Sequence, residues 1–185
     1  MYGIDLLVEE HDNIIRFIKV VKKMCIAIIE GKAPDPADFV FVVAFGRNYA
    51  DSIHHGKEEE ILFDIMLKNL GPLADKLIRN GMLVEHDLGR LFMKQLDEAI
   101  KNYRDTKSAE SKLAIITNAS GYGDLLMRHI EKENAAAYPF AAKNLSEELC
   151  NQLNDETSKF EEREDTIKRK QYYLDILQRL QNKYQ

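Results

Sequence analysis

The chain has 185 residues, of which 45% are hydrophobic and 31% are charged, and its formal net charge is -5. This length and composition fit one globular domain and exclude an intrinsically disordered chain. The acidic balance argues against nucleic acid as a partner, because nucleic-acid-binding proteins usually carry a basic surface that neutralises phosphates.

Apolar side chains at steps of three and four residues predict a first helix over residues 5–30. The helix is expected to end at Gly31, and the sequence GKAPDP forms a linker after it. The inward face of this helix consists of Leu7, His11, Ile14, Ile18, Val21, Cys25 and Ile28.

A second helix is expected to begin near Pro36, where proline suits the first turn and the Asp35 side chain can cap free amides. It runs to about Asn69, before the helix-breaking pair Gly71 and Pro72. The sequence HHGKEEE, residues 54–60, lies within this helix.

A third helix is predicted from residue 73 or 82 to residue 103, with a kink at Gly81 if it begins at the earlier position. The segment RDTKSAES separates it from a fourth helix over residues 109–143, which Pro139 bends or ends. The inward face of the third helix carries Met82, Leu83, His86, Met93, Leu96 and Ile100, and that of the fourth carries Ile115, Ala119, Tyr122, Leu126, His129, Glu133 and Phe140.

Residues 146–185 predict one or two further helices, because EELCNQL and YYLDILQRLQ keep a helical period on either side of a charged segment. The chain shows neither strand-like alternation nor a glycine-rich nucleotide loop, so the fold class is all-α. Short connections between long helices favour an up-down antiparallel four-helix bundle over residues 1–143. Residues 144–185 are then a C-terminal helical extension that packs on the bundle.

The beginning of the chain has no basic segment followed by an apolar one, and no run of about 18 uncharged apolar residues occurs. We therefore expect a soluble cytoplasmic protein that does not bind membranes. The two cysteines, Cys25 and Cys150, lie far apart and outside any CxxC pair, which suggests neither a disulfide framework nor a thiolate metal site. The oligomeric state does not follow from the sequence.

All five histidines lie in the four predicted bundle helices, four of them on an inward face. A single histidine facing a core is usually a structural group with satisfied hydrogen bonds. Two of the inward-facing histidines, however, precede a glutamate by four residues: His55 with Glu59, and His129 with Glu133. This spacing stacks imidazole and carboxylate one turn apart on the same helix face, so that both can reach one small target.

Such a target must be positive, because buried carboxylates beside neutral imidazoles would otherwise be strongly destabilised by desolvation. Arg90, four residues after His86, could supply the charge in a structural salt bridge. A metal ion fits better, since imidazole nitrogen with carboxylate oxygen suits iron, manganese or zinc. Four histidines and two glutamates exceed the needs of a single tetrahedral zinc ion, which favours two metal ions bridged by carboxylates.

The second helix offers another pair, His54 and Glu58, displaced by one residue. We favour His55 and Glu59, because they continue the stripe of Leu62, Phe63 and Met66, whereas the other pair would lie about 100° round an α-helix. His54 and Glu58 are second-tier candidates, and a solvated Glu58 is expected. The residues expected at the surface are Lys57, Glu60, Glu131 and Lys132.

Four motifs in order resemble the hemerythrin-like, HHE cation-binding family over residues 5–139. They are a first-helix histidine, then HHGKEEEILF, then MLVEHDLGRLF, then MRHIEKEN. The resemblance implies a four-helix bundle with a non-haem di-iron centre, in which zinc or manganese could substitute for iron. By matching positions, the ligands would be His11, His55, Glu59, His86, His129 and Glu133, with Glu59 and Glu133 bridging the ions.

The chain departs from the oxygen-carrying members that this pattern resembles. Arg90 stands where they have a second third-helix histidine, and Asn134 stands where they have an aspartate. An ion with fewer ligands keeps positions open for small molecules. We therefore expect a protein that binds or senses dioxygen, nitric oxide or iron. The alternative is an enzyme that reduces peroxide, dioxygen or nitric oxide with electrons from a separate donor protein.

Two other classes fit less well. Ferritin-like di-iron oxidases use Glu-x-x-His elements, whereas here histidine precedes glutamate by four. A metal-free scaffold whose extension binds a partner helix would leave the buried carboxylates unexplained.

Overall fold

The computed structural model describes residues 1–184, and within this range the chain is helical with no strands. The prediction of an all-α fold is therefore confirmed. The helices of the bundle form four rods joined by short connections. Their segments are α1 (Tyr2–Ile29); α2 (Pro36–Phe45), η1 (Gly46–His55), η2 (Glu58–Leu62) and α3 (Phe63–Asn69); α4 (Gly71–Leu77), η3 (Ile78–Met82) and α5 (Leu83–Thr106); and α6 (Ala109–Lys132), η4 (Glu133–Ala137) and α7 (Tyr138–Asn144).

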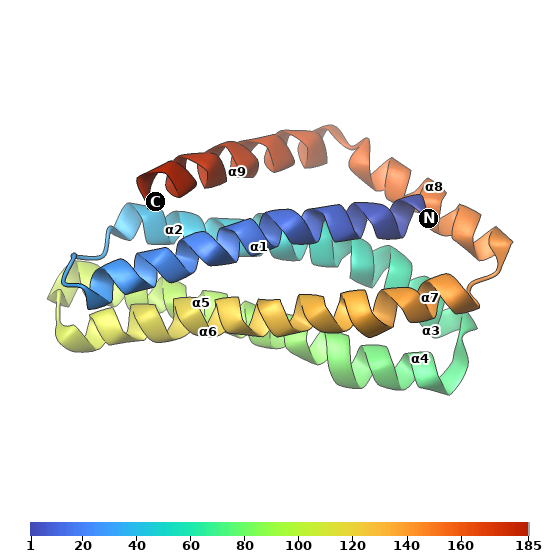
Figure 1. Ribbon diagram of the computed structural model, residues 1–185, viewed down its shortest axis with the longest axis horizontal. Helices are drawn as coiled ribbons and strands as arrows, with labels where there is room; N and C mark the ends of the chain where they lie inside the picture. The colour runs from blue at the N-terminus through green and yellow to red at the C-terminus, as the bar shows by residue number, and fades with distance from the viewer. Residues whose placement is uncertain (185) are drawn as a thin grey trace.

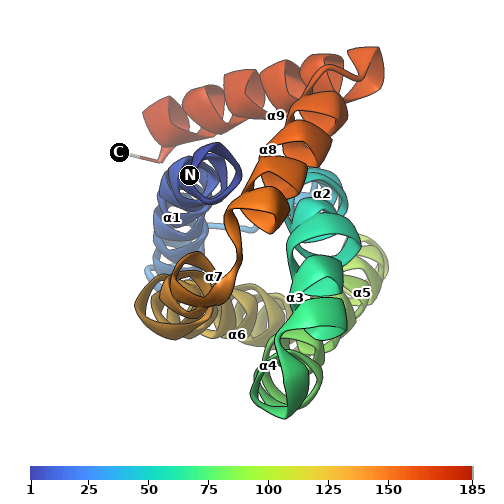
Figure 2. The same ribbon diagram turned by 90° about the vertical axis from the view of Figure 1, so that its right-hand side faces the viewer.

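The four rods run up and down in chain order and lie at the corners of one bundle (Figures 1 and 2). Local sequence signals set their ends. The Asp35 side chain accepts a hydrogen bond from the amide of Ala37 at 3.0 Å, as expected for the N-cap of the second rod. Gly31, after α1, has a φ of 97° and Gly71, before α4, has a φ of 70°, a backbone conformation that glycine adopts without strain.

Three of the rods contain π-helical turns, labelled η1 to η4. A π-helix pairs residue i with i+5, so each turn holds more residues than an α-turn and successive side chains spread over a smaller angle. In the second rod this geometry extends over most of residues 46–62. The angle between successive side chains in this segment therefore differs from that of a regular α-helix. Pro139 lies in the first turn of α7, directly after η4, and does not end the fourth rod.

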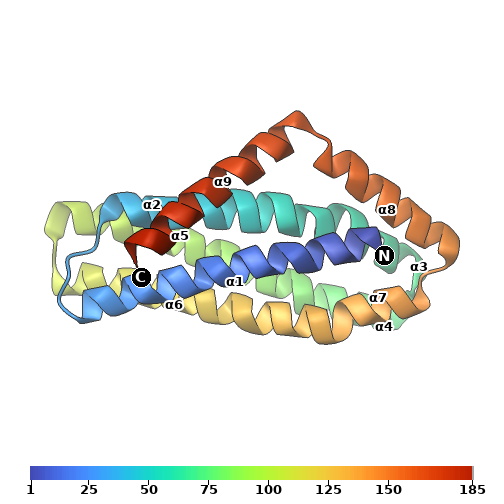
Figure 3. The same ribbon diagram turned by 45° about the horizontal axis from the view of Figure 1, so that its top comes forward.

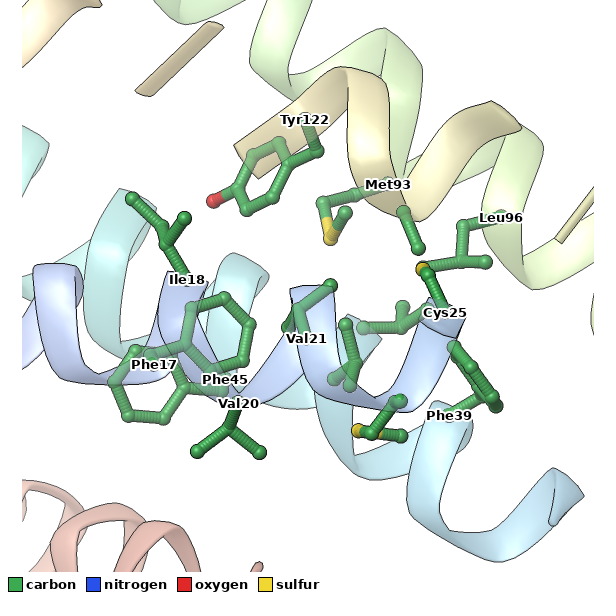
Figure 4. Packing of buried hydrophobic residues seen from close by; sticks show 14 of the residues in the cluster. Phe17, Ile18, Val20, Val21, Cys25, Phe39, Phe45, Met93, Leu96 and Tyr122 are labelled. Carbon is green, nitrogen blue, oxygen red and sulfur yellow. The ribbon is translucent and has the colours of Figure 1, made fainter. Parts of the chain in front are cut away.

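Two apolar clusters fill the bundle at its two ends. The larger contains residues from α1, α2, α5, α6 and α9, including the stacked rings of Phe17 and Phe45 with centroids 4.2 Å apart (Figure 4). The smaller contains Ile4 and Leu7 of α1 with side chains of α3, α4 and α7. Along α1, His11 falls between Leu7 of one cluster and Ile14 of the other. The histidines therefore occupy a polar layer between two apolar ones.

The C-terminal residues form two further helices, α8 (Glu147–Glu161) and α9 (Glu164–Lys183), which meet in a V over the bundle (Figure 3). Helix α8 packs against α1 and η2, and α9 packs against α1 and η1. They cover the outer side of the first two rods. Among the helices of residues 1–184, none is long and apolar enough to cross a membrane.

Candidate metal centre

All five histidines are buried, each less than 4% exposed, at the same level of the bundle. His11 comes from α1, His54 and His55 from η1, His86 from α5 and His129 from α6. The ring centroids of His55 and His86 are 3.8 Å apart and those of His11 and His54 are 4.6 Å apart. Every rod thus contributes at least one imidazole to one small volume.

These side chains form two groups that could hold a metal ion, each with ligand atoms within 4.8 Å of one another. The pocket-side group consists of His55, Glu58, His86 and His129, and the tail-side group consists of His11, His54, Glu58 and Glu133. Glu58 belongs to both groups. Glu133 also reaches both, because its oxygens lie 3.2 Å from His11 Nε2 and 3.0 Å from His129 Nε2.

A second layer of acceptors surrounds the imidazoles, because each histidine directs Nδ1 toward a side-chain oxygen. The five distances lie between 2.6 and 3.3 Å. Nδ1 must donate to these oxygens, so the Nε2 atom of a neutral ring carries the lone pair and faces the interior. The pairs are His11 with Asn134, His54 with Glu10, His55 with Asp51, His86 with Glu59 and His129 with Glu85.

Several interior atoms lack a hydrogen-bond partner. His86 Nε2 and His129 Nε2 lie 3.0 Å apart, although the Nδ1 atom of each ring already faces a carboxylate. Two lone pairs at this separation repel each other unless a proton or a cation lies between them. His54 Nε2, Glu58 Oε2 and both carboxylate oxygens of Glu133 are buried without a partner. A metal ion would satisfy this donor set, since the atoms that lack partners are those that bind metals.

The electrostatics of the site favour added positive charge. Burial lowers the pKa of His54 to about 4 and holds that of His55 well below its usual value, so both rings are neutral and able to bind a metal. Burial acts in the same direction on His86 and His129, yet the pKa of each is raised, with Glu133 the principal opposing influence. Burial and the charge of Glu133 raise the pKa of Glu58 well above its usual value. The same negative field that attracts protons would attract a metal ion.

The structure reverses the register expected for the second rod. Glu58 is fully buried between the two groups, whereas the Glu59 side chain is 28% exposed and accepts from His86 Nδ1 at 2.6 Å. His54 is as buried as His55, so both belong to the cluster. The expectation of a solvated Glu58 was therefore wrong. In a helix of 3.6 residues per turn, His54, His55 and Glu58 lie within about 100° of one another and Glu59 lies further round, so one inward face holds all three once the rod buries His54 as well as His55.

Lys57 is a second correction in the same rod. We expected it at the surface, but it is 1% exposed and lies beneath Phe160 and Glu161 of α8. The extension covers the outer side of this rod, which a pattern confined to the rod cannot reveal. Glu60, Glu131 and Lys132 are exposed as expected.

Tyr138 is a site residue to which the sequence assigned no role. Its hydroxyl donates to Glu58 Oε1 at 2.6 Å and lies 3.3 Å from His11 Nε2. The ring is 2% exposed and lies parallel to the His11 ring. Tyr138 therefore orients one of the two shared carboxylates.

A cavity of about 270 Å³ adjoins the pocket-side group. Arg90 lies beside it and does not belong to either group: its guanidinium pairs with Asp51 at 2.8 Å, Glu59 at 2.6 Å and Asp87 at 3.0 Å. Arg90 therefore does form the structural salt bridges that we considered, but outside the metal centre. Two of its partners, Asp51 and Glu59, are second-layer acceptors. The cavity is lined by Gly46, Arg47, Asp51, His55, His86, Gly89, Arg90, Met93 and Tyr122.

An up-down helical bundle with two buried groups of imidazole and carboxylate ligands defines a cation-binding class of protein. The model of the Hemerythrin HHE cation binding domain matches residues 2–141, which is most of the chain. The chain belongs to this family, as its motifs predicted. No match was found among curated proteins or solved structures. The matched range contains every histidine and carboxylate of the two groups and leaves out α8 and α9.

Proposed function

We propose that this protein holds two iron ions, one in each group, and uses them to bind or sense dioxygen, nitric oxide or iron itself in the cytoplasm. The observation that carries the proposal is the orientation of the imidazoles. All five turn Nδ1 outward to an acceptor and Nε2 inward, beside two buried carboxylates whose oxygens include three without partners. A pair of redox-active ions would supply affinity for a small gas and a change of oxidation state.

The residues of the chain divide the remaining tasks. Glu58 and Glu133 each approach histidines of both groups, so these two carboxylates would hold ions in both groups. Tyr138 fixes the orientation of Glu58 by donating to its second oxygen. The second-layer acceptors hold each ring so that its Nε2 atom stays directed at the centre. Zinc or manganese would fit the same donors, so the metal found depends on supply.

The cavity is consistent with the binding of a small ligand at the pocket-side group, because His55 and His86 line it. Arg90 lies there in place of a further histidine and pairs with Asp51. The cavity's volume of about 270 Å³ exceeds what a diatomic gas needs, which keeps open a second function: reduction of peroxide, dioxygen or nitric oxide with an external electron donor. Binding without turnover is our first choice, and turnover would need electrons from a separate donor.

The test is metal analysis of protein produced in iron-supplemented medium and purified without a metal-affinity column, with absorption spectra before and after reduction. We expect about two irons per chain, and bands that bleach on reduction and return with oxygen. Repeated consumption of oxygen or peroxide by protein supplied with an electron donor would favour the enzyme instead. Less than about half an equivalent of any metal in folded protein would refute the proposal.

A further inference from the structure

Four charged side chains form a cluster behind His54, where α8 and α9 cover the bundle: Glu10 and Lys57 are buried, and Glu161 and Lys170 are partly buried. Lys57 Nζ donates to Glu10 Oε1 at 2.5 Å and also to Glu161 of α8. Lys170 Nζ of α9 donates to the same oxygen of Glu10 at 2.9 Å and also to Glu161. Two positive and two negative groups balance each other. Because charges are costly to bury unless they are paired, this cluster depends on all four members.

Glu10 joins the cluster to the metal centre. Its Oε1 atom accepts from the two lysines, and its Oε2 atom accepts from His54 Nδ1 at 3.0 Å. Two lysine ammonium groups and the His54 ring thus hold both carboxylate oxygens of Glu10, which makes it a fixed acceptor. It keeps the proton of His54 on Nδ1 and leaves Nε2, which has no partner, directed at the centre.

The C-terminal helices hold this acceptor in place. Lys170 contacts Glu10 directly, and Glu161 pairs with the other lysine that does so. Both residues lie beyond the range that the family model matches. Among the five second-layer acceptors, Glu10 is the one that α8 and α9 support; the partners of Glu59 and Glu85 come from the bundle itself.

We propose that helices α8 and α9 are part of the metal centre, in which Glu10 is a positioning residue for His54 and Lys170 with Glu161 holds Glu10 against it. This inference rests on the proposed metal binding and adds a contribution from outside the family domain. It predicts which of the two ions is affected. Weakening the cluster should loosen the ion in the tail-side group, whereas the ion in the pocket-side group should be retained, because its histidines have their own acceptors.

The experiment compares Lys170→Met with Lys183→Met. Lys183 also ties α9 to the bundle, through Asp35 at 2.8 Å and Asp38 at 2.6 Å, but it lies far along α9 from Glu10. Anaerobically loaded iron(II) protein is mixed with a chromogenic iron(II) chelator, and iron release is followed over time. For Lys170→Met we expect one of two release phases to accelerate by about tenfold, the lower end of the effect of losing a second-layer partner, because Lys170 acts through Glu10 and Lys57 still pairs with it. Lys183→Met should release iron as the wild type does.

Two further variants separate positioning from folding. Lys170→Arg, which keeps the charge, should restore slow release. Glu10→Gln should accelerate the same single phase even if Lys170→Met does not fold. Equal release from Lys170→Met, Glu10→Gln and the wild type would overturn the inference while leaving the proposed function intact. Equal acceleration by Lys183→Met would also overturn it, because the effect would then belong to docking of α9 in general. A wild type that holds no iron would instead defeat the proposed function.

Discussion

The two metal-binding groups share Glu58 and the same ligand chemistry but differ in what stands behind them. Behind the pocket-side group lie Asp51, Glu59 and the partly exposed Arg90, next to a cavity. Behind the tail-side group lie Tyr138 and the cluster of Glu10, which α9 supports. If both groups hold an ion, we expect the first to be the more accessible and the second to release its ion more slowly. The layer behind the ligands, rather than the ligands themselves, would then distinguish the two halves of the centre.

The largest effect is expected from removing Glu58, the carboxylate that the two groups share. Glu58→Ala should lower the iron content from about two per chain to less than about half an equivalent, because both ions lose a bridging carboxylate. Metal analysis of the purified variant measures this effect. The matched control is Glu60→Ala, since Glu60 lies two residues away and is exposed. Full iron content in Glu58→Ala would show that Glu58 is not a ligand.

A smaller effect should come from the second layer of the pocket side. Glu59→Ala removes the acceptor of His86 Nδ1 and should weaken iron affinity by about 10–100-fold without abolishing binding. Chelator competition measures the affinity, and the phase affected should be the one that Glu10→Gln leaves unchanged. Complete loss of iron from Glu59→Ala would return Glu59 to the role of ligand that its spacing from His55 first suggested.

The cavity can be narrowed without touching a ligand. A Cβ at Gly89 would lie 3.4 Å from Tyr122 Cε2, so the side chain of Gly89→Leu should occupy the cavity. We expect gas binding to slow by about tenfold, which corresponds to a barrier about 1.4 kcal/mol higher, with iron content unchanged. Stopped-flow mixing of reduced protein with oxygen measures the rate. Gly81→Leu is the control, because nothing lies within 4 Å of a Cβ there; equal rates in both variants would place the access route elsewhere.

The smallest effect is expected at the mouth of the cavity. Arg90→Gln removes ion pairs whose guanidinium is 40% exposed, so unfolding by denaturant should show a loss of less than about 1 kcal/mol. Iron content should stay unchanged, because Arg90 lies outside both groups. Loss of iron from this variant would mean that Arg90 is needed to hold Glu59 against His86, and the two sides would then depend on their outer layers equally.

The sequence by itself was sufficient for the rods and for the family. Periodicity placed the four bundle helices, and Asp35, Gly31 and Gly71 marked their ends, because capping and turn preferences act over a few neighbouring residues. The histidines indicated a site because several imidazoles on apolar helix faces are costly to bury unless they find a partner. Motif order then led to the family, which the match over residues 2–141 confirms.

The choice between Glu58 and Glu59 was decided by tertiary structure. Spacing from His55 favoured Glu59, but the second rod is turned so that His54, His55 and Glu58 all face the interior. The rotation of a helix about its own axis depends on the helices packed against it, so the pattern within one segment does not reveal it. The second layer was equally hidden, since Glu10 lies 44 residues before His54 and Glu85 lies 44 residues before His129.

Lys57 shows the same limit most clearly. Three glutamates follow it directly in the chain, and by itself the second rod would leave it in water. It is buried because α8, about a hundred residues later, places Glu161 and the ring of Phe160 over it. Local sequence thus determined which residues could be ligands, through helix period and donor chemistry. Only the packing of distant helices decided which of them face the centre and which support it, because burial and pairing of charge depend on contacts between segments far apart in the chain.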